Sequence, residues 1–292
     1  MIESAQRFRE TCQKARGSGA LVGFVPTMGA LHRGHIRLIG QAREECGFVT
    51  ISIFVNPLQF TSHEDFATYP RTIEQDRAVA VSLGVDVAFV PEEGEMYPGG
   101  RPEVAIDPGP LGDRLEGVSR PGHFRGVLTV VAKLFNLVGP CRAYFGEKDS
   151  QQLALVRRMV AGLSFPVRVV ACPIVRDPDG LALSSRNSRL SDGQRRAAPV
   201  LFEGLSDAAT RSRLGERSAD VLKAEIARRI GGEPQAKLDY VAIVDEGTWE
   251  EVRSIHGPAR ALVAAYFGEV RLIDNVALPW EPGSGVQNTQ SS

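Results

Sequence analysis

Two histidines and two glycines lie at the first junction between a predicted strand and a predicted helix. Residues 26–35 read PTMGALHRGH, and His32 and His35 are three residues apart, so they can face the same side of the first helical turn. Ligands of open α/β sheets bind at the carboxyl ends of the strands, and a helix N-terminus offers unpaired N–H groups to an anion. Two imidazoles there could donate to phosphate oxygens. A single histidine is more often structural, but this pair together with Gly29 and Gly34 favours a phosphate site.

A second polar cluster occupies another predicted junction between a strand and a helix. Residues 146–152 read GEKDSQQ and bring together a lysine, acids and two amides. Lys148 suits a phosphate contact, and Gln152, one turn into the helix, could direct its amide at a polar substrate. The alternative, in which Asp149 only caps the helix and Lys148 is solvated, fits this segment equally well.

Two further segments carry polar groups that could bind a small ligand. Residues 183–187 read LSSRN, and two hydroxyls and a guanidinium on a mobile connection could close on a triphosphate. Residues 56–60 read NPLQF directly after a predicted strand, where the amide of Gln59 could recognise hydroxyls and carboxylates. Each segment alone is also compatible with an ordinary turn.

Several common kinds of site are absent from the sequence. It contains no P-loop pattern, and Gly17 and Gly19 precede the first predicted strand, whereas a dinucleotide-binding loop follows it. It contains no G-x-S-x-G, and His63, His123 and His256 have no partner at the spacing of a metal site or a catalytic triad. We therefore assign no protein ligand to a metal.

The elements that must position these residues follow an alternating pattern. Apolar segments rich in Val and Ile alternate with longer amphipathic segments up to residue 175, which is typical of a parallel sheet with crossover helices. The predicted strands are residues 21–26, 48–55, 85–90, 143–145 and 167–175. The predicted helices are residues 35–46, 72–83, 123–137 and 149–163. Residues 92–121 are dense in Gly, Pro and acidic residues, and we expect them to form a long surface excursion.

After residue 175 the pattern changes to that of a small α+β domain. Ser191 and Gln194 have the spacing of a capping box and open a predicted helix that runs to about Thr210. A second helix is predicted over 218–230, followed by strands at 238–244, 261–267 and 270–273. The sequence thus predicts the α/β class, with a Rossmann-like doubly wound parallel sheet in residues 1–175. It predicts a smaller C-terminal α+β domain in 176–281 and a disordered tail in 282–292.

The charge and cysteine content of the chain limit which binding partners and which compartment we expect. The chain has 34 Lys and Arg against 35 Asp and Glu, a net charge of −1, so a nucleic-acid partner or a membrane surface is not expected. Four widely separated cysteines without a CxxC pair favour a reducing compartment. The N-terminus lacks the layout of a signal peptide, and no apolar run is long enough for a membrane helix. We expect a cytoplasmic protein.

Taken together, these segments resemble the pantothenate synthetase (pantoate–β-alanine ligase) family over nearly the whole chain. The segments that carry the resemblance are VPTMGALHRGH at 25–35, SIFVNPLQF at 52–60, YPRT at 69–72, RPGHFRGVLTVVAKLFNLV at 120–138, YFGEKDSQQLALVRRMV at 144–160, DGLALSSRN at 179–187 and RLIDN at 271–275. The family belongs to the nucleotidylyl transferases with a His-x-Gly-His motif, which here is residues 32–35. Ser150 departs from the family, in which an aromatic residue is common at this position.

The resemblance implies a two-step reaction at one site. ATP adenylates the carboxylate of pantoate and releases pyrophosphate, and the amine of β-alanine then attacks the pantoyl adenylate to give pantothenate and AMP. The resemblance implies catalytic roles for His35, His32, Lys148 and Arg186, which we expect to supply positive charge to the triphosphate. The implied ATP-binding residues are Met28, Gly29, Ala30, Leu31, His32, Arg33, Gly34, His35, Gly146, Glu147, Lys148, Asp149, Val175, Leu183, Ser184, Ser185 and Arg186. Gln59 and Gln152 would bind pantoate.

The resemblance also implies partners and an assembly. The substrates would be pantoate, β-alanine and ATP, with Mg²⁺ bound mainly through the phosphates. The first domain would bind ATP and pantoate, the second would act as a lid, and the chain would form a homodimer. Two alternatives stay open at this point: a nucleotidylyl transferase of another small substrate, and a nucleotide-binding module without catalytic activity.

Overall fold

The computed structural model describes residues 1–280, apart from the side chain of His63. The predicted tail at 282–292 lies outside the described residues. The chain divides into two compact units, Met1–Val175 and a second unit that begins at Arg176. Each unit has its own sheet, and we describe each by itself.

Unit 1 is built on a five-stranded parallel sheet with the strand order β3-β2-β1-β4-β5. Its strands are β1 (Val22–Thr27), β2 (Phe48–Ile53), β3 (Val87–Phe89), β4 (Cys141–Gly146) and β5 (Val167–Cys172). Its α-helices are α1 (Ala5–Gly17), α2 (Arg33–Glu45), α3 (His63–Ala67), α4 (Ile73–Ser82), α5 (Glu93–Met96), α6 (Glu116–Ser119), α7 (His123–Val138) and α8 (Ser150–Gly162). Its 3₁₀ turns are η1 (Pro57–Gln59), η2 (Pro110–Asp113) and η3 (Glu147–Asp149). This arrangement confirms the predicted doubly wound α/β class.

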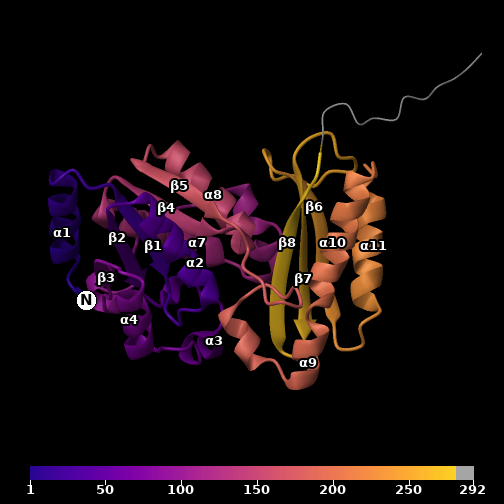
Figure 1. Cartoon of the computed structure of the whole chain (residues 1–292), viewed down its shortest axis with the longest axis horizontal. Helices are drawn as coiled ribbons and strands as arrows, with labels where there is room; N and C mark the ends of the chain where they lie inside the picture. The colour runs from indigo at the N-terminus through magenta and orange to yellow at the C-terminus, as the bar shows by residue number, and fades with distance from the viewer. Residues whose placement is uncertain (281–292) are drawn as a thin grey trace, which may run out of the picture. The chain divides into compact units, whose positions relative to one another are not determined.

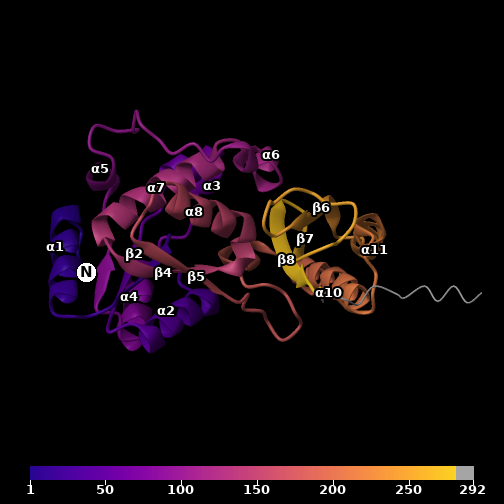
Figure 2. The same cartoon turned by 90° about the horizontal axis from the view of Figure 1, so that it is seen from above.

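Helices cover both faces of this sheet. Figure 2 shows α7 and α8 on one face and α2 and α4 on the other. On the first face the Phe24 ring of β1 meets Phe135 of α7 edge-on at 6.5 Å between ring centroids. On the other face Val25 belongs to a buried apolar cluster with Ile39 of α2. Burial on both faces explains why the strands are nearly continuous runs of apolar residues.

Helix α7 approaches η1 closely because residue 126 is glycine. A Cβ atom at Gly126 would lie 2.2 Å from the carbonyl oxygen of Leu58, which no side chain can accept. This close approach brings the apolar face of α7 against the turn that carries Gln59.

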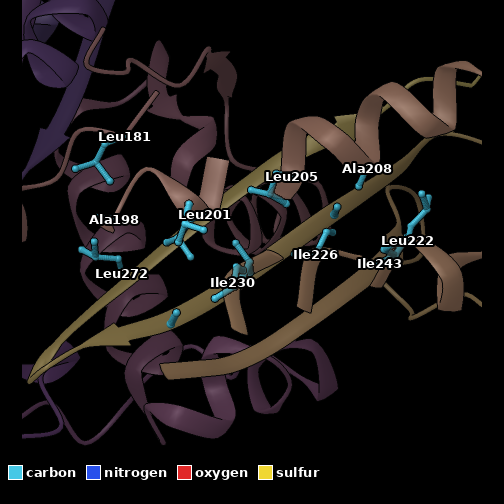
Figure 3. Close-up of a cluster of buried hydrophobic side chains, with 14 of the residues drawn as sticks. Leu181, Ala198, Leu201, Leu205, Ala208, Leu222, Ile226, Ile230, Ile243 and Leu272 are labelled. Atoms are coloured by element: carbon cyan, nitrogen blue, oxygen red, sulfur yellow. The ribbon is translucent and has the colours of Figure 1, made fainter. Parts of the chain in front are cut away.

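Unit 2 is an antiparallel sheet with two long helices packed on it (Figure 1). Its strands are β6 (Lys237–Asp245), β7 (Ala259–Phe267) and β8 (Val270–Leu278), in the order β6-β7-β8. Its helices are η4 (Ser185–Arg189), α9 (Asp192–Ala197), α10 (Val200–Arg213) and α11 (Ala219–Gly231). Figure 3 shows the core between the helices and the sheet, in which Leu201, Leu205 and Ile226 are fully or almost fully buried. The predicted α+β composition of this part is confirmed.

Two predictions for unit 2 need correction. The helix predicted from Ser191 to about Thr210 is two helices, because Pro199 cannot donate the backbone hydrogen bond that would continue α9. The capping box of Ser191 and Gln194 is confirmed. The third strand, predicted over 270–273, runs to Leu278. Sequence patterning ended it at Asp274 and Asn275, polar residues that are buried here because Arg176 and Arg260 bind them.

Two predictions for unit 1 also need correction. Helix α1 was not predicted, and it packs Phe8 in a parallel stack on Phe89 of β3 with 4.5 Å between ring centroids. Residues 92–121 are not wholly a surface excursion. Met96, Tyr97 and Leu111 are buried, so the segment is anchored in the core at residues 96–97 and again at residue 111. No helix within residues 1–280 combines the length and the apolar character that a membrane span requires.

Candidate active site

The two histidines of the His-x-Gly-His motif form a capping box at the start of α2. His32 is the N-cap residue, and its Nδ1 accepts the N–H of Gly34 at 3.1 Å. In return the Nδ1 of His35 accepts the N–H of His32 at 3.3 Å. A Cβ atom at Gly34 would lie 2.7 Å from Cε1 of His32, so only glycine leaves room for this ring. The glycine of the His-x-Gly-His motif is therefore required because the His32 ring packs directly on the backbone of Gly34.

These hydrogen bonds fix which nitrogen of each ring carries the proton. Because Nδ1 accepts in both rings, Nε2 carries the proton in the neutral state and is the donor that remains for a ligand. Burial, followed by the charges of His32 and Lys148, lowers the pKa of His35 to about 3. Burial and then the charge of Lys148 also lower the pKa of His32. The lowered pKa values favour uncharged N–H donors near neutral pH over the expected cations.

The loop before α2 is held by a buried carboxylate on α4 that the sequence did not single out. Asp76 is 2% exposed, and it accepts the N–H of Ala30 at 3.0 Å and the N–H of Leu31 at 2.7 Å. The backbone of Gly29 and Ala30 has positive φ of 84° and 50°. A carboxylate that accepts two backbone N–H groups stabilises this unusual conformation. No local pattern reveals Asp76, because it reads as an ordinary acid in the first turns of a helix.

Gln59 is the centre of a buried network. Its Oε1 accepts from Nδ2 of Asn56 at 3.2 Å, and its Nε2 lies 2.8 Å from Sδ of Met28. Its backbone carbonyl accepts from Nδ1 of His123 at 2.8 Å and from Arg120 at 3.3 Å. His123, for which the sequence offered no partner, thus holds the turn that carries Gln59.

The second predicted cluster lies where β4 leads into α8. Lys148 forms an ion pair with Asp149 at 3.3 Å, and the Lys148 side chain is 21% exposed. Asp149 stands at the N-cap position of α8, but its side chain makes no capping hydrogen bond. A purely capping role for Asp149 is therefore wrong.

The two adjacent glutamines of α8 have different environments. Gln151 is 2% exposed, and its amide donates to the carbonyls of Leu111 and Arg114 at 2.8 Å each and accepts from Glu116 at 3.1 Å. Gln152 instead lines a cavity.

Six of the predicted site residues of unit 1 line this one cavity. It has a volume of about 190 Å³ and lies at the carboxyl ends of β1 and β4, where sites of open α/β sheets are found. The predicted site residues that line it are Met28, His35, Gln59, Gly146, Asp149 and Gln152. One wall is apolar and comes from Val127, Val130, Val131 and Leu134 of α7. Tyr69 also lines the cavity and was not predicted as a site residue.

The remaining predicted residues lie in flanking loops or in unit 2. Gly29–Gly34, Glu147 and Lys148 are neighbours in sequence of the cavity residues, at the ends of β1 and β4, and Val175 is the half-buried last residue of unit 1. Leu183, Ser184, Ser185 and Arg186 belong to unit 2, where Oγ of Ser184 accepts the N–H of Arg186 at 3.2 Å.

The segment with these serines is fastened within unit 2. Asn187 donates to the carbonyl of Ala182 at 3.0 Å. Arg176, just before the segment, forms a two-pronged ion pair with Asp274 of β8 at 2.5 and 2.9 Å and lies 3.9 Å over the ring of Phe202. A forked guanidinium pair of this kind is a strong and directional contact.

Comparison with known proteins gives a consistent result. The family model described as pantoate-beta-alanine ligase matches residues 1–277. The chain is 50% identical to pantothenate synthetase of Rubrobacter xylanophilus, with 96% of this chain and 98% of the relative covered. It is 52% identical to pantothenate synthetase of Acidobacterium capsulatum, with 90% and 88% covered.

Solved structures agree. The crystal structure of pantothenate synthetase from Thermus thermophilus matches with a TM-score of 0.86 and 48% identity, covering 94% of this chain and 98% of that one. A ligase structure from Francisella tularensis, described as complexed with beta-gamma ATP and beta-alanine, matches with a TM-score of 0.76 and 37% identity, covering 94% and 97%. Matches of this extent include both units and every motif described above, and the chain belongs to the pantoate–β-alanine ligase family.

Proposed function

We propose that the cavity of unit 1 is where this chain carries out the reaction of its family. The chain is an ATP-dependent acid–amine ligase that joins pantoate to β-alanine through a pantoyl adenylate, releasing AMP and pyrophosphate. The observation that carries the location is that one cavity is lined by His35 of the His-x-Gly-His motif, by Asp149 beside Lys148, and by the amides of Gln59 and Gln152. The first two groups suit a nucleotide and the amides suit a small hydroxy acid.

In this proposal ATP binds to the loops that follow β1 and β4. Nε2–H of His32 and of His35 would donate to phosphate oxygens, while Lys148 supplies the positive charge that the neutral histidines do not. Because these donors are already fixed by the capping box and by Asp76, little reorganisation is needed as charge builds on the departing pyrophosphate. The remaining assigned residues of both loops, Met28–Gly34 and Gly146–Asp149, would surround the nucleotide.

Pantoate fits the rest of the cavity by its chemistry. It has one carboxylate, two hydroxyls and two methyl groups on a central carbon. The amides of Gln59 and Gln152 can bind the polar groups without adding charge, and the α7 wall of valines and a leucine can contact the methyl groups. A carboxylate held by amides rather than by arginine keeps its nucleophilicity for attack on the α-phosphate.

The second unit and the metal complete the proposal. We assign Leu183, Ser184, Ser185 and Arg186 to the triphosphate and Val175 to the nucleotide, with unit 1 as the substrate-binding domain and residues 176–281 as a lid that excludes water from the adenylate. Within the described residues no three His, Cys, Asp or Glu side chains form a cluster that could hold a metal ion. Mg²⁺ would bind mainly through the phosphates of ATP, and Asp149 is the carboxylate among the residues that line the cavity. A homodimer and a cytoplasmic location stay predictions.

Dependence of each product on each substrate tests the proposed function. Pyrophosphate release is expected only when pantoate is present, and AMP with pantothenate only when β-alanine is added. Pyrophosphate release without pantoate would point to a nucleotidylyl transferase of another substrate, and ATP binding without turnover would point to a non-catalytic module. His35→Ala is expected to slow adenylation at least about hundredfold, as loss of a charge-stabilising donor does. His256→Ala, at an exposed position in unit 2, is the matched control.

A further inference from the structure

A buried chain of hydrogen bonds connects the segment after α5 to the cavity. Tyr97 is 4% exposed, and its hydroxyl donates to Oδ1 of Asn56 at 2.8 Å. Asn56 is 1% exposed, and its Nδ2 donates to Oε1 of Gln59 at 3.2 Å. Gln59 lines the cavity, whereas neither Tyr97 nor Asn56 does. These hydrogen bonds therefore link Tyr97, which does not line the cavity, to Gln59, which does.

The donor and acceptor directions of these hydrogen bonds follow from backbone groups that can only donate or only accept. Oδ1 of Asn56 also accepts the backbone N–H of Leu58 at 3.3 Å, and its Nδ2 also donates to the carbonyl of Gly126 at 3.2 Å. A backbone N–H only donates and a carbonyl only accepts, so these two contacts favour one orientation of the Asn56 amide, and the Tyr97 hydroxyl adds a third contact that supports it. Gln59 must then turn Oε1 toward Asn56, which leaves Nε2 on the side of Met28 and the cavity.

The Tyr97 hydroxyl supports Asn56 by donating a hydrogen bond to its Oδ1. Burial, with the charge of Glu93 as a smaller cause, raises the pKa of Tyr97, so its hydroxyl keeps its proton at working pH. Its ring is held edge-on against Phe54 at 6.0 Å between centroids, and Nζ of Lys133 lies 5.9 Å from its centre. These ring contacts do not depend on the hydroxyl, so the hydroxyl can be removed alone.

We propose that Tyr97 is a positioning residue that fixes the donor side of the Gln59 amide through Asn56 and so sets the affinity for pantoate. Without the hydroxyl, Oδ1 of Asn56 loses one of its two donors, and the Gln59 amide is less strongly held with its N–H groups toward the cavity. A carboxylate or hydroxyl of the substrate then meets an amide oxygen in part of the molecules. This inference rests on the proposed function, because it takes pantoate as the ligand of Gln59.

Tyr97→Phe tests the inference in the full-length protein. Loss of one buried hydrogen bond between neutral groups corresponds to about a three- to tenfold rise in KM for pantoate. We expect KM for ATP and kcat to change less than about twofold, because these hydrogen bonds reach the nucleotide loop at Met28, whose thioether sulfur is only a weak acceptor. Tyr266→Phe, on β7 of unit 2, is the matched control and should leave all three constants unchanged.

A double-mutant cycle separates positioning from a general structural effect. In a Gln59→Ala background the Tyr97→Phe change should no longer raise KM for pantoate, because the amide it orients is gone. An equal rise in KM for ATP and pantoate, an equal effect of Tyr97→Phe in both backgrounds, or no change in KM for pantoate would overturn the inference. If Tyr97→Phe does not fold, Asn56→Asp replaces it. The new carboxylate accepts from Gln59, turns its Oε1 to the cavity, and should raise KM for pantoate more than about tenfold.

The wild-type protein distinguishes this inference from the proposed function. Wild type that forms no pantothenate from pantoate, β-alanine and ATP would contradict the proposed function itself. Wild type that does so, with Tyr97→Phe kinetically identical to it, would contradict only the role of Tyr97.

Discussion

Oδ1 of Asp76 accepts the backbone N–H of Leu31 at 2.7 Å across 45 positions of sequence. Its other oxygen accepts the N–H of Ala30 at 3.0 Å and the hydroxyl of Thr72 at 3.3 Å. One buried carboxylate therefore holds the loop that delivers the His-x-Gly-His motif to the cavity.

Asp76→Asn is expected to weaken this loop. An amide has one acceptor oxygen, so its NH₂ must face one of the two backbone N–H groups that the carboxylate binds. We expect a loss of about 1–3 kcal/mol in the free energy of unfolding and a fall of about ten- to hundredfold in kcat/KM for ATP. Steady-state kinetics and urea unfolding measure both. Glu74→Gln on the same helix should change neither, and equal losses in the two variants would contradict the role of Asp76.

Gly29→Ala is expected to destabilise the protein, whereas Gly40→Ala is not. At Gly29 φ is +84°, and a Cβ atom would lie 2.9 Å from Oδ2 of Asp76. At Gly40, inside α2, a Cβ atom meets nothing within 4 Å. We expect a loss of at least about 1 kcal/mol for the first change and a gain of about 0.5–1 kcal/mol for the second. Thermal unfolding of the two variants checks this, and a stable Gly29→Ala protein would refute the steric argument.

The half-buried His35 makes stability depend on pH. Its pKa is about 3 in the folded protein against 6.5 when unperturbed, so between these values the unfolded chain binds the extra proton. Its contribution to stability is therefore complete above pH 6.5 and is lost as the pH falls toward 3. Relative to His35→Gln, wild type should lose about 2 kcal/mol of unfolding free energy between about pH 7.5 and pH 5. Parallel urea titrations at both pH values measure this difference, and identical pH dependence of the two proteins would show that the fold does not hold His35 in its neutral form.

Gln151→Ala and Gln152→Ala should separate stability from substrate binding. Gln151 holds residues 111–116 through three hydrogen bonds, so its loss should cost about 1–3 kcal/mol in unfolding free energy. Gln152 lines the cavity, so its loss should raise KM for pantoate about tenfold and leave the unfolding free energy within about 0.5 kcal/mol. The reverse pattern would mean that the two roles are assigned to the wrong residues.

The sequence by itself determined the fold class, the order of the main elements and the motif loops. Strands that are buried on both faces have nearly continuous runs of apolar residues in the sequence. The histidines and the glycine at the start of α2 contact one another within four residues of sequence. Such information is local, because secondary structure and helix caps depend on neighbours in the chain. The break between α9 and α10 at Pro199 is also a local feature of the sequence. The predicted single helix ignored this proline and followed the helical spacing of the apolar residues.

Only the tertiary structure decided how the site is held and charged. Asp76 and Tyr97 act on residues 45 and 41 positions away, and an acid in a helix or a tyrosine in an irregular segment carries no local sign of that contact. The histidines were expected to be cations, but burial, which depends on the whole packed unit, lowers the pKa of both and favours the neutral form. The polar residues Asp274 and Asn275 likewise ended the predicted strand. In the fold, Arg176 and Arg260 bind these two side chains, so β8 continues past them. Residue types named the chemistry, and long-range packing set protonation, orientation and rigidity.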